Sequence, residues 1–238
     1  MYEERWYRKL IRADDLVTFE VVIEETDLLI MATKELKSEV TKLTLEVREE
    51  IKKYIATDPD FKESLTPYEV SNNAPKVIKE MAKASKSVGV GPMACVAGVI
   101  AEYVGKGILR HSKEVIVENG GDIFIKSMRK RKIGIYAGSS PLSNKIAIEI
   151  DDKDTPLGVC TSSGTVGHSI SFGKADAVTV LSCSTALADA AATGIGNLVK
   201  EPKDIKQAVE FAQFIDGLKG VIVIKDDKMG LWGDIKLV

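Results

Sequence analysis

The residues of this chain best suited to chemistry begin with a turn-like segment, Asn119-Gly120-Gly121-Asp122. Two adjacent glycines permit positive φ angles and let a ligand approach the backbone closely. The aspartate that follows them could hydrogen-bond a ligand ring or a ligand hydroxyl. The same four residues suit a tight hairpin, because Asn-Gly is a strong hairpin signal. A ligand-binding turn and a purely structural turn are therefore both open.

A second candidate segment runs from Cys160 to Ser169 and contains no charged residue. A thiol such as that of Cys160 becomes a useful nucleophile where nearby groups lower its pKa, and His168 could carry the proton. The N–H groups and hydroxyls of such a loop could hold an anion or a polar ligand. The candidate ligand-binding residues are Thr161, Ser162, Ser163, Gly164 and Thr165. The alternative is that Cys160 is a small core residue and His168 a hydrogen-bonded loop residue.

A third candidate is the alanine-rich run that contains Asp189 and Thr193. These residues are four apart, so on a helix they share one face. A carboxylate and a hydroxyl at this spacing suit a hard cation such as Mg²⁺, which prefers oxygen ligands. The alternative is a helix that packs tightly on a sheet, with Asp189 near its N-terminus for electrostatic reasons.

Charge and cysteine content restrict the class of protein. The 238 residues include 33 basic and 35 acidic ones, and a net charge of -2 provides no global field for nucleic acid or an anionic membrane. Cys95, Cys160 and Cys183 are too few for a disulfide scaffold and indicate a reducing compartment. The first ten residues lack the apolar core of a signal peptide, and no uncharged stretch suits a membrane span. We expect a cytoplasmic protein with a small-molecule ligand and without a nucleic-acid or membrane partner.

Hydrophobic patterning predicts the elements that must position these candidate residues. The predicted strands are 17–23, 27–32, 114–117, 122–125, 132–136, 145–150, 177–181, 221–224 and 231–238. The predicted helices are 34–57, 73–86 with Asn73 as N-cap, 93–103, 184–199 and 202–215, and residues 61–70 are expected to form a loop. Strands in antiparallel pairs, with helices in blocks between them, favour an α+β fold. No linker or repeat divides the chain, so we expect a single domain over residues 1–238.

The candidate segments occur in an order that resembles a known family. NGGDI at 119–123, TSSG at 161–164, and ADAVTVL and ALADAAATG within 175–194 resemble the flavin transferase family ApbE. That family has a GGDI motif, an ATSG segment, a VTV strand and an AD-x-x-x-T helix in the same order. The segments GVCTSSGTVGHS and ADAAATGIGN are more similar still to an uncharacterised ApbE-like family of anaerobic archaea and bacteria. The resemblance implies an ApbE-like fold, with helices packed against antiparallel sheets.

The resemblance also implies roles for particular residues. In the flavin transferases the aspartate and threonine of the AD-x-x-x-T helix hold Mg²⁺, and they correspond to Asp189 and Thr193 here. The aspartate of GGDI lies near the flavin and corresponds to Asp122. These enzymes transfer FMN from FAD to a protein threonine. Two features depart from the family: the Asp-Pro-x-Thr-Gly run that follows the family histidine is missing after His168, and Cys160 precedes the TSSG segment.

Three functions follow as hypotheses. The ApbE-like family is linked to homocysteine formation in sulfur assimilation, so our first hypothesis is sulfur transfer through a persulfide on Cys160, with sulfur-assimilation partner proteins. The second is a Mg²⁺-dependent transferase or hydrolase that acts on FAD, FMN or a related nucleotide through Asp122, Asp189 and Thr193. The third is a non-catalytic flavin- or nucleotide-binding subunit. All three require the three segments to meet at one cavity, and we expect a homo-oligomer.

Overall fold

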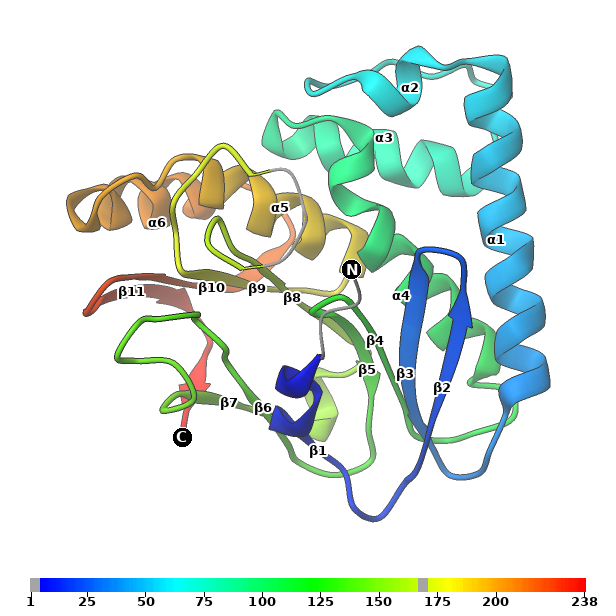
Figure 1. The fold of residues 1–238 in the computed structure, drawn as a ribbon, viewed down its shortest axis with the longest axis horizontal. Coiled ribbons are helices and arrows are strands. Elements are labelled where there is room, and N and C mark those ends of the chain that lie inside the picture. Colours follow the sequence, from blue (N-terminus) through cyan, green and yellow to red (C-terminus); the bar gives the residue numbers. More distant parts are fainter. Residues whose placement is uncertain (1–4, 167–170) are drawn as a thin grey trace.

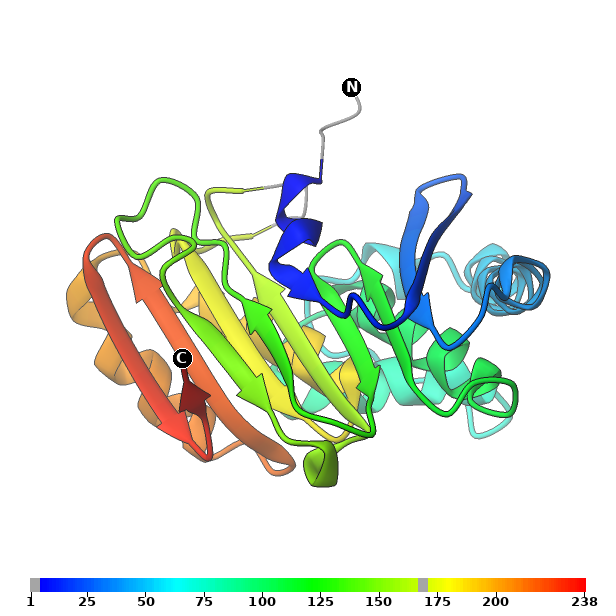
Figure 2. The same ribbon diagram turned by 90° about the horizontal axis from the view of Figure 1, so that it is seen from below.

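The computed structural model describes residues 5–166 and 171–238 as three layers (Figures 1 and 2). An eight-stranded sheet forms the middle layer, helices cover one of its faces, and a four-stranded sheet packs on the other. Both sheets are antiparallel. This arrangement confirms the α+β class predicted from the order of strands and helices.

The strand order of the middle sheet is β11-β10-β9-β8-β5-β4-β3-β2. Its strands are β2 (Val17–Ile23), β3 (Thr26–Ala32), β4 (Val115–Asn119), β5 (Asp122–Lys126), β8 (Leu157–Ser162), β9 (Ala177–Ser182), β10 (Leu218–Lys225) and β11 (Lys228–Gly233). The central strands β4, β5, β8 and β9 consist almost entirely of buried residues. Both faces of these strands are covered, so even their polar residues lie inside the molecule.

The smaller sheet has the order β1-β6-β7-β12. Its strands are β1 (Ile11–Arg12), β6 (Arg131–Gly134), β7 (Ala147–Ile150) and β12 (Lys236–Leu237). Buried and more exposed residues alternate along β6 and β7, as expected for strands with one covered face. The first and last strands of the chain thus both join this sheet.

Helices form the layer on the opposite face of the middle sheet (Figure 1). They are α1 (Lys37–Thr57), α2 (Asp60–Glu63), α3 (Lys76–Val88), η2 (Pro92–Cys95), α4 (Val96–Ile108), α5 (Thr185–Asn197), η4 (Pro202–Asp204) and α6 (Ile205–Gln213). Two further 3-10 turns, η1 (Trp6–Leu10) and η3 (Asp152–Asp154), lie outside this layer. Among the described residues no single helix is long and apolar enough to cross a membrane; α3 and residues 92–108 reach that length only as a pair bent by 102°.

Two hydrophobic cores result from this layering. The larger core fills the space between helices and middle sheet, and Phe124 on β5 packs into it where Gly105 on α4 leaves room. The smaller core lies between the two sheets and contains Ile116, Ile125 and Ile148. Successive residues of β4 and β5 point alternately into the two cores. One face of each central strand therefore looks toward the helices and the other toward the smaller sheet.

The structure differs from the predicted elements at several places. Asn73 does not cap α3; Pro75 is its N-cap, because the fixed φ of proline suits a helix start. The expected loop at 61–70 begins inside α2. Residues 160–162, which we treated as the start of a polar loop, are the end of strand β8 (Leu157–Ser162), which was not predicted. The predicted strand 231–238 is split between the two sheets, because the chain turns at Gly233, whose φ is +97°.

Candidate functional site

The Asn119–Asp122 segment is the two-residue turn of the β4–β5 hairpin. Asn119 pairs with Asp122 across the hairpin, and Gly120 and Gly121 have φ angles of +68° and +101°. A side chain would be strained at both glycines, which explains the Gly-Gly pair. The Glu118 carboxylate accepts a hydrogen bond from the Gly121 N–H at 2.8 Å. The structural interpretation of this turn is thus confirmed, while its ligand role stays a prediction.

Strand β8 places Cys160 directly opposite Asp122 in the sheet. Side chains of directly opposed residues share a face, so both point toward the helices. The Cys160 sulfur lies 3.4 Å from the carbonyl oxygen of Thr185, at the start of α5, and also within hydrogen-bond reach of the Asp122 carboxyl. Cys160 is completely buried. The thiol therefore connects the hairpin turn to the first turn of α5.

Helix α5 carries Asp189 against the N-terminus of α4. The Gly98 N–H donates to Asp189 Oδ2 at 2.8 Å. A Cβ atom at Gly98 would lie only 2.7 Å from the Asp189 Cβ and from the Thr185 carbonyl oxygen, so the close approach of the two helices requires glycine here. The negative side chain also interacts favourably with the positive end of α4. Gly98, which belongs to none of the motifs singled out in the sequence, thus positions Asp189, the predicted metal ligand.

Asp122, Cys160 and Asp189 come together in one buried cluster, while their sharing of a ligand cavity stays a prediction. Burial raises the pKa of Asp189 to about 7, against a hydrogen bond from Gly98 that lowers it. Burial, and then the charge of Asp189, raises the pKa of Asp122 well above its usual range. The thiol pKa values of Cys160 and Cys95 are also raised well above normal, first by burial and then by the two carboxylates. Two carboxyls and two thiols therefore share one poorly solvated region.

This environment opposes the formation of a thiolate at Cys160. A raised thiol pKa leaves the sulfur protonated at neutral pH, whereas a reactive cysteine needs nearby cations or donors that lower its pKa. His168, the other predicted catalytic residue, lies outside the described residues. Cys95 is buried, as expected for a packing residue, and Cys183 is exposed.

The face of α5 that carries Asp189 offers further oxygen donors. Thr185, Asp189 and Thr193 follow one another at steps of four, so they lie along one side of the helix. The Thr185 hydroxyl is buried and has no hydrogen-bond partner among the described residues. Thr193 is partly exposed. A carboxylate with hydroxyls on either side fits the oxygen preference of Mg²⁺.

Protein side chains alone do not complete a metal site here. Within residues 5–166 and 171–238 no group of three or more His, Cys, Asp and Glu side chains could hold a metal ion. A cation at Asp189 would need ligand oxygens or water as additional ligands, which is the usual situation for Mg²⁺ bound with a phosphate.

The predicted hydroxyl residues are divided between two places. Thr161 belongs to the site, because its N–H donates to the Gly121 carbonyl oxygen at 3.3 Å. Ser163 instead accepts hydrogen bonds from the N–H groups of Thr165 and Val166. Thr165 donates to Asp176, which lines a separate hollow of about 280 Å³.

The remaining residues of that segment are partly structural. Ser162 ends strand β8 opposite Val178 of β9, and the Gly164 N–H donates to the Ala175 carbonyl oxygen at 2.9 Å. Among the predicted ligand-binding residues 161–165, Thr161 is therefore the one whose backbone is hydrogen-bonded to the hairpin turn.

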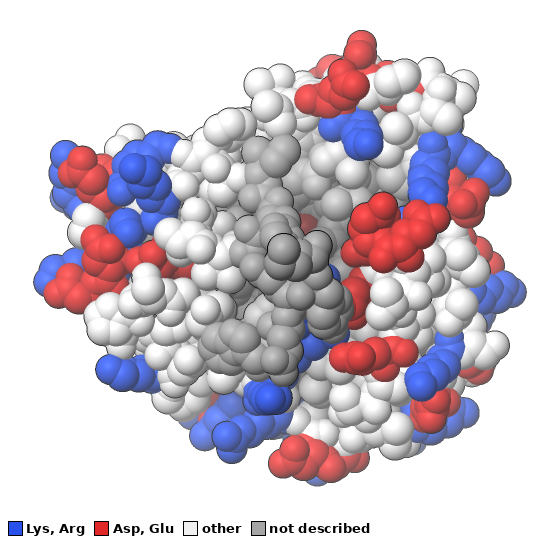
Figure 3. All heavy atoms as spheres, viewed as in Figure 1, with Lys and Arg blue, Asp and Glu red and all other residues white. Residues whose placement is uncertain are grey.

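The surface charge of the molecule shows no single dominant sign. Acidic and basic side chains lie intermixed around the face of the molecule shown in Figure 3.

Sequence analysis missed three residues that shape the site. Glu118 holds the turn, and Glu102 of α4 accepts hydrogen bonds from the N–H groups of Thr185 and Ala186 at 2.7 and 3.2 Å. Arg8 binds Glu118 at 2.7 Å. A charged residue inside the apolar run of β4 was a signal for Glu118, because a buried carboxylate requires partners. Arg8 and Glu102 had no comparable signal.

Sequence comparison identifies proteins similar to this chain. The family model described as AbpE bacteria matches residues 8–224. A UPF0280 protein of Methanococcus aeolicus is 46% identical over 196 residues, which cover 80% of this chain and 79% of that protein. A UPF0280 protein of Methanosarcina acetivorans is 41% identical over 216 residues, which cover 90% and 85% of the two chains.

Comparison with solved structures confirms the expected fold. A mutant of the flavin transferase ApbE from Vibrio cholerae has a TM-score of 0.60 at 14% sequence identity, covering 91% of this chain and 96% of that chain. The apo form of the flavinyl transferase ApbE from Pseudomonas stutzeri has a TM-score of 0.60 at 14% identity, covering 91% and 93%. At this identity the likeness establishes an ApbE-like fold.

Proposed function

Since the chain belongs to the family described as AbpE bacteria, we propose that it binds a flavin nucleotide together with Mg²⁺ at the buried carboxylates of Asp122 and Asp189. The reaction class that we propose is transfer or hydrolysis of the nucleotide at its pyrophosphate. The solved structures with a similar fold are flavin transferases, which favours FAD or FMN over other nucleotides.

The observation that carries this proposal is a pair of neighbouring buried carboxylates to which no Lys or Arg side chain of the described residues is paired. Asp122 and Asp189 are each 7% exposed, and neither forms an ion pair with Lys or Arg among the described residues. Two like charges in a poorly solvated place repel each other, and here the charge of Asp189 adds to burial in raising the pKa of Asp122. A bound divalent cation would remove that penalty. Ionisable residues whose burial side by side costs folding free energy are typical of functional sites.

In this proposal the two carboxylates, Asp189 and Asp122, have different roles. Asp189 and Thr193 would hold the cation on the face of α5 that they share, with the buried Thr185 hydroxyl one turn before Asp189. When bound, Mg²⁺ neutralises the pyrophosphate oxygens and polarises phosphorus toward attack. The Gly120-Gly121 backbone would let the ligand lie close to the turn, where Asp122 accepts or donates a hydrogen bond.

Incubation with FAD and Mg²⁺ tests this function. We expect calorimetry to show FAD or FMN binding that depends on Mg²⁺, and chromatography to show FMN or AMP if the nucleotide is cleaved. Asp189→Asn should weaken the Mg²⁺-dependent binding by about tenfold or more, because the amide keeps the shape and the bond to Gly98 but loses the charge. Asp227→Asn, at an exposed position, is the control. A wild-type protein that binds neither flavin in the presence of Mg²⁺ would overturn the proposal.

The sulfur-transfer hypothesis can be separated in the same preparation. It requires a Cys160 thiolate, and burial beside two carboxylates disfavours that form. After treatment with inorganic polysulfide, which transfers a sulfane sulfur to a thiolate and leaves as a polysulfide shorter by one sulfur, mass spectrometry of wild type and Cys160→Ala would show whether Cys160 gains the mass of one sulfur atom. A persulfide on Cys160 would favour sulfur transfer over flavin chemistry; unmodified Cys160 would exclude it.

A further inference from the structure

We propose that Arg8, on the N-terminal turn η1, is a positioning residue for the Asn119–Asp122 turn, which it holds through Glu118. The inference rests on the proposed function only where ligand affinity is used as a readout. Arg8 and the turn are more than a hundred residues apart in sequence, and a hydrogen bond of 2.7 Å joins Arg8 to Glu118. The N-terminal segment lies beside the hairpin turn in Figures 1 and 2.

The Glu118 carboxylate connects Arg8 to the turn. One of its oxygens accepts the Gly121 N–H at 2.8 Å, and the other accepts the Arg8 Nε–H at 2.7 Å. Glu118 is 1% exposed. A carboxylate this deeply buried needs a charged partner, and among the described residues Arg8 forms its ion pair. The orientation of Glu118 is therefore determined by Arg8.

Arg8 is itself held in one orientation by two neighbouring strands. Its guanidinium donates to the Asp27 carbonyl and carboxylate oxygens at 2.8 and 2.9 Å, and to Glu20 at 3.0 Å. Asp27 lies on β3 and Glu20 on β2. Because a planar guanidinium with several fixed bonds has little freedom to rotate, it is a firm point of attachment for Glu118.

The turn is thereby held from both faces of the sheet. Side chains alternate along β4, so Asn119 points toward the helices, where its amide donates to the Ala97 carbonyl oxygen at 3.1 Å, and Glu118 points the other way. Gly120 and Gly121 have no side chains with which to pack. Asp122 follows directly after the turn, so its position relative to Asp189 depends on these two attachments.

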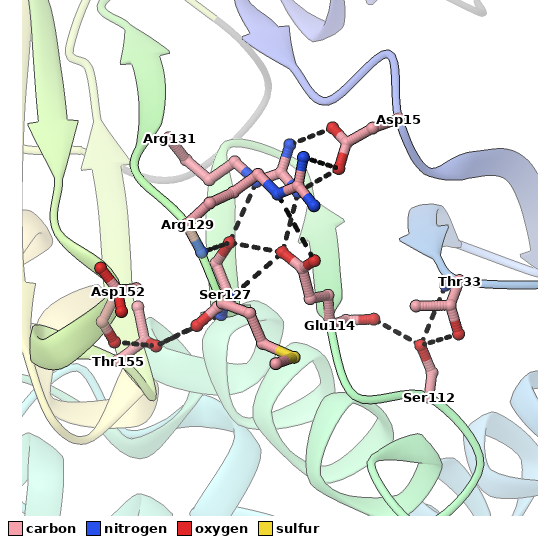
Figure 4. Close-up of polar contacts among 10 residues, drawn as sticks. Asp15, Thr33, Ser112, Glu114, Ser127, Arg129, Arg131, Asp152 and Thr155 are labelled. Carbon is pink, nitrogen blue, oxygen red and sulfur yellow. Dashed lines mark hydrogen bonds and ion pairs between the residues drawn. The ribbon is translucent and has the colours of Figure 1, made fainter.

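A second buried ion pair provides a matched control at the far end of the same hairpin. Arg131 binds Glu114, the residue before β4, at 2.8 Å and also binds Asp15 (Figure 4). Arg131 and Glu114 are 5% and 6% exposed, comparable with the 8% and 1% of Arg8 and Glu118. Since β4 extends between Glu114 and Glu118, loss of Arg131 should destabilise the sheet without releasing the turn.

The test compares Arg8→Met with Arg131→Met in the full chain. Three quantities are measured: melting temperature, hydrogen–deuterium exchange of the peptide containing the turn, and affinity for FMN with Mg²⁺. We expect both variants to melt at a lower temperature. Only Arg8→Met should accelerate exchange at the turn and weaken FMN binding, each by about tenfold, because one buried hydrogen bond is lost there.

Two milder variants keep the test decisive if Arg8→Met fails to fold. Arg8→Lys retains the charge but cannot form all of the fixed bonds, and Glu118→Gln retains an acceptor for Gly121 but loses the ion pair. Both should accelerate exchange at the turn more than Arg131→Met does. Equal exchange in the variants at the two ends of the hairpin would overturn the inference. If wild type does not bind FMN, the proposed function fails, but the exchange comparison still decides the role of Arg8.

Discussion

At the scale of single residues, burial decides which of the candidate groups can react. Cys160 looked like a nucleophile because it precedes a polar segment, yet its thiol is inside the larger core beside two carboxylates. Asp122 and Asp189 occupy the same place, where their charges are poorly solvated. The same low polarity that keeps the thiol protonated makes the carboxylates a favourable place for a cation.

Thiol labelling checks this conclusion. Cys183 is exposed, whereas Cys95 and Cys160 are buried with raised pKa values. Iodoacetamide at neutral pH should therefore modify Cys183 in the native protein and modify Cys95 and Cys160 only after denaturation. Peptide mapping by mass spectrometry distinguishes the three. Rapid native labelling of Cys160 in a Cys183→Ser background would contradict the structure and revive the thiolate mechanism.

At the scale of elements, the site depends on the close packing of α4 against α5. Gly98 lets the N-terminus of α4 approach Asp189, and Glu102 of α4 binds the first N–H groups of α5. Helix α4 thus supplies a hydrogen-bond donor to Asp189 of α5, and its Glu102 accepts hydrogen bonds from the N-terminus of α5. Both helices are rich in alanine and glycine, and these small residues allow the short distance between the helices. Helix propensity does not explain the glycines, since glycine disfavours helices.

Gly98→Ala is expected to disturb both stability and the site. The added methyl would meet Asp189 and Thr185 at 2.7 Å, so α4 must move away, at a cost of about 1–3 kcal/mol in unfolding free energy. Gly196→Ala is the matched control on α5, because its methyl would lie at 3.7 Å from Val178. Urea unfolding and FMN titration measure the two effects. A Gly98→Ala protein as stable as Gly196→Ala would contradict the packing.

At the scale of the whole molecule, ion pairs join the N-terminal segment to the rest of the fold. Arg8 binds at the turn end of the β4–β5 hairpin, and Asp15 binds Arg131 at its open end (Figure 4). Ser127 and Glu114 extend the second network from β4 and β5 to β6. The segment from Arg8 to Asp15 is therefore an integral part of the layered structure.

Acid should weaken this attachment. A hydrogen bond from Arg131 lowers the pKa of Asp15 to about 2, compared with about 4 in an unfolded chain. Because the folded-state pKa is depressed, the contribution of Asp15 to stability is present above pH 4 and is lost as the pH falls toward 2. The difference in unfolding free energy between wild type and Asp15→Asn should therefore shrink over this range. A difference independent of pH would show that the ion pair contributes nothing.

The segments with strong local signals were predicted well. The Asn-Gly pair placed the β4–β5 turn, and the spacing of Val40, Leu43 and Val47 predicted α1. Strand β8 was missed because its last residues are polar. Thr161 is accommodated there since its hydroxyl bonds that of Thr179 on β9 at 2.9 Å, a partner that is visible only after the strands pair.

What the sequence alone determined was the class of fold, the family resemblance and the identity of the groups that meet at the site. These follow from turn chemistry, periodicity and motif order, which depend on neighbouring residues. Only the tertiary structure decided that Cys160 is buried beside two carboxylates, that Gly98 positions Asp189, and that Arg8 supports the turn through Glu118. Burial and charge interactions act through space between distant parts of the chain, so no local pattern encodes them.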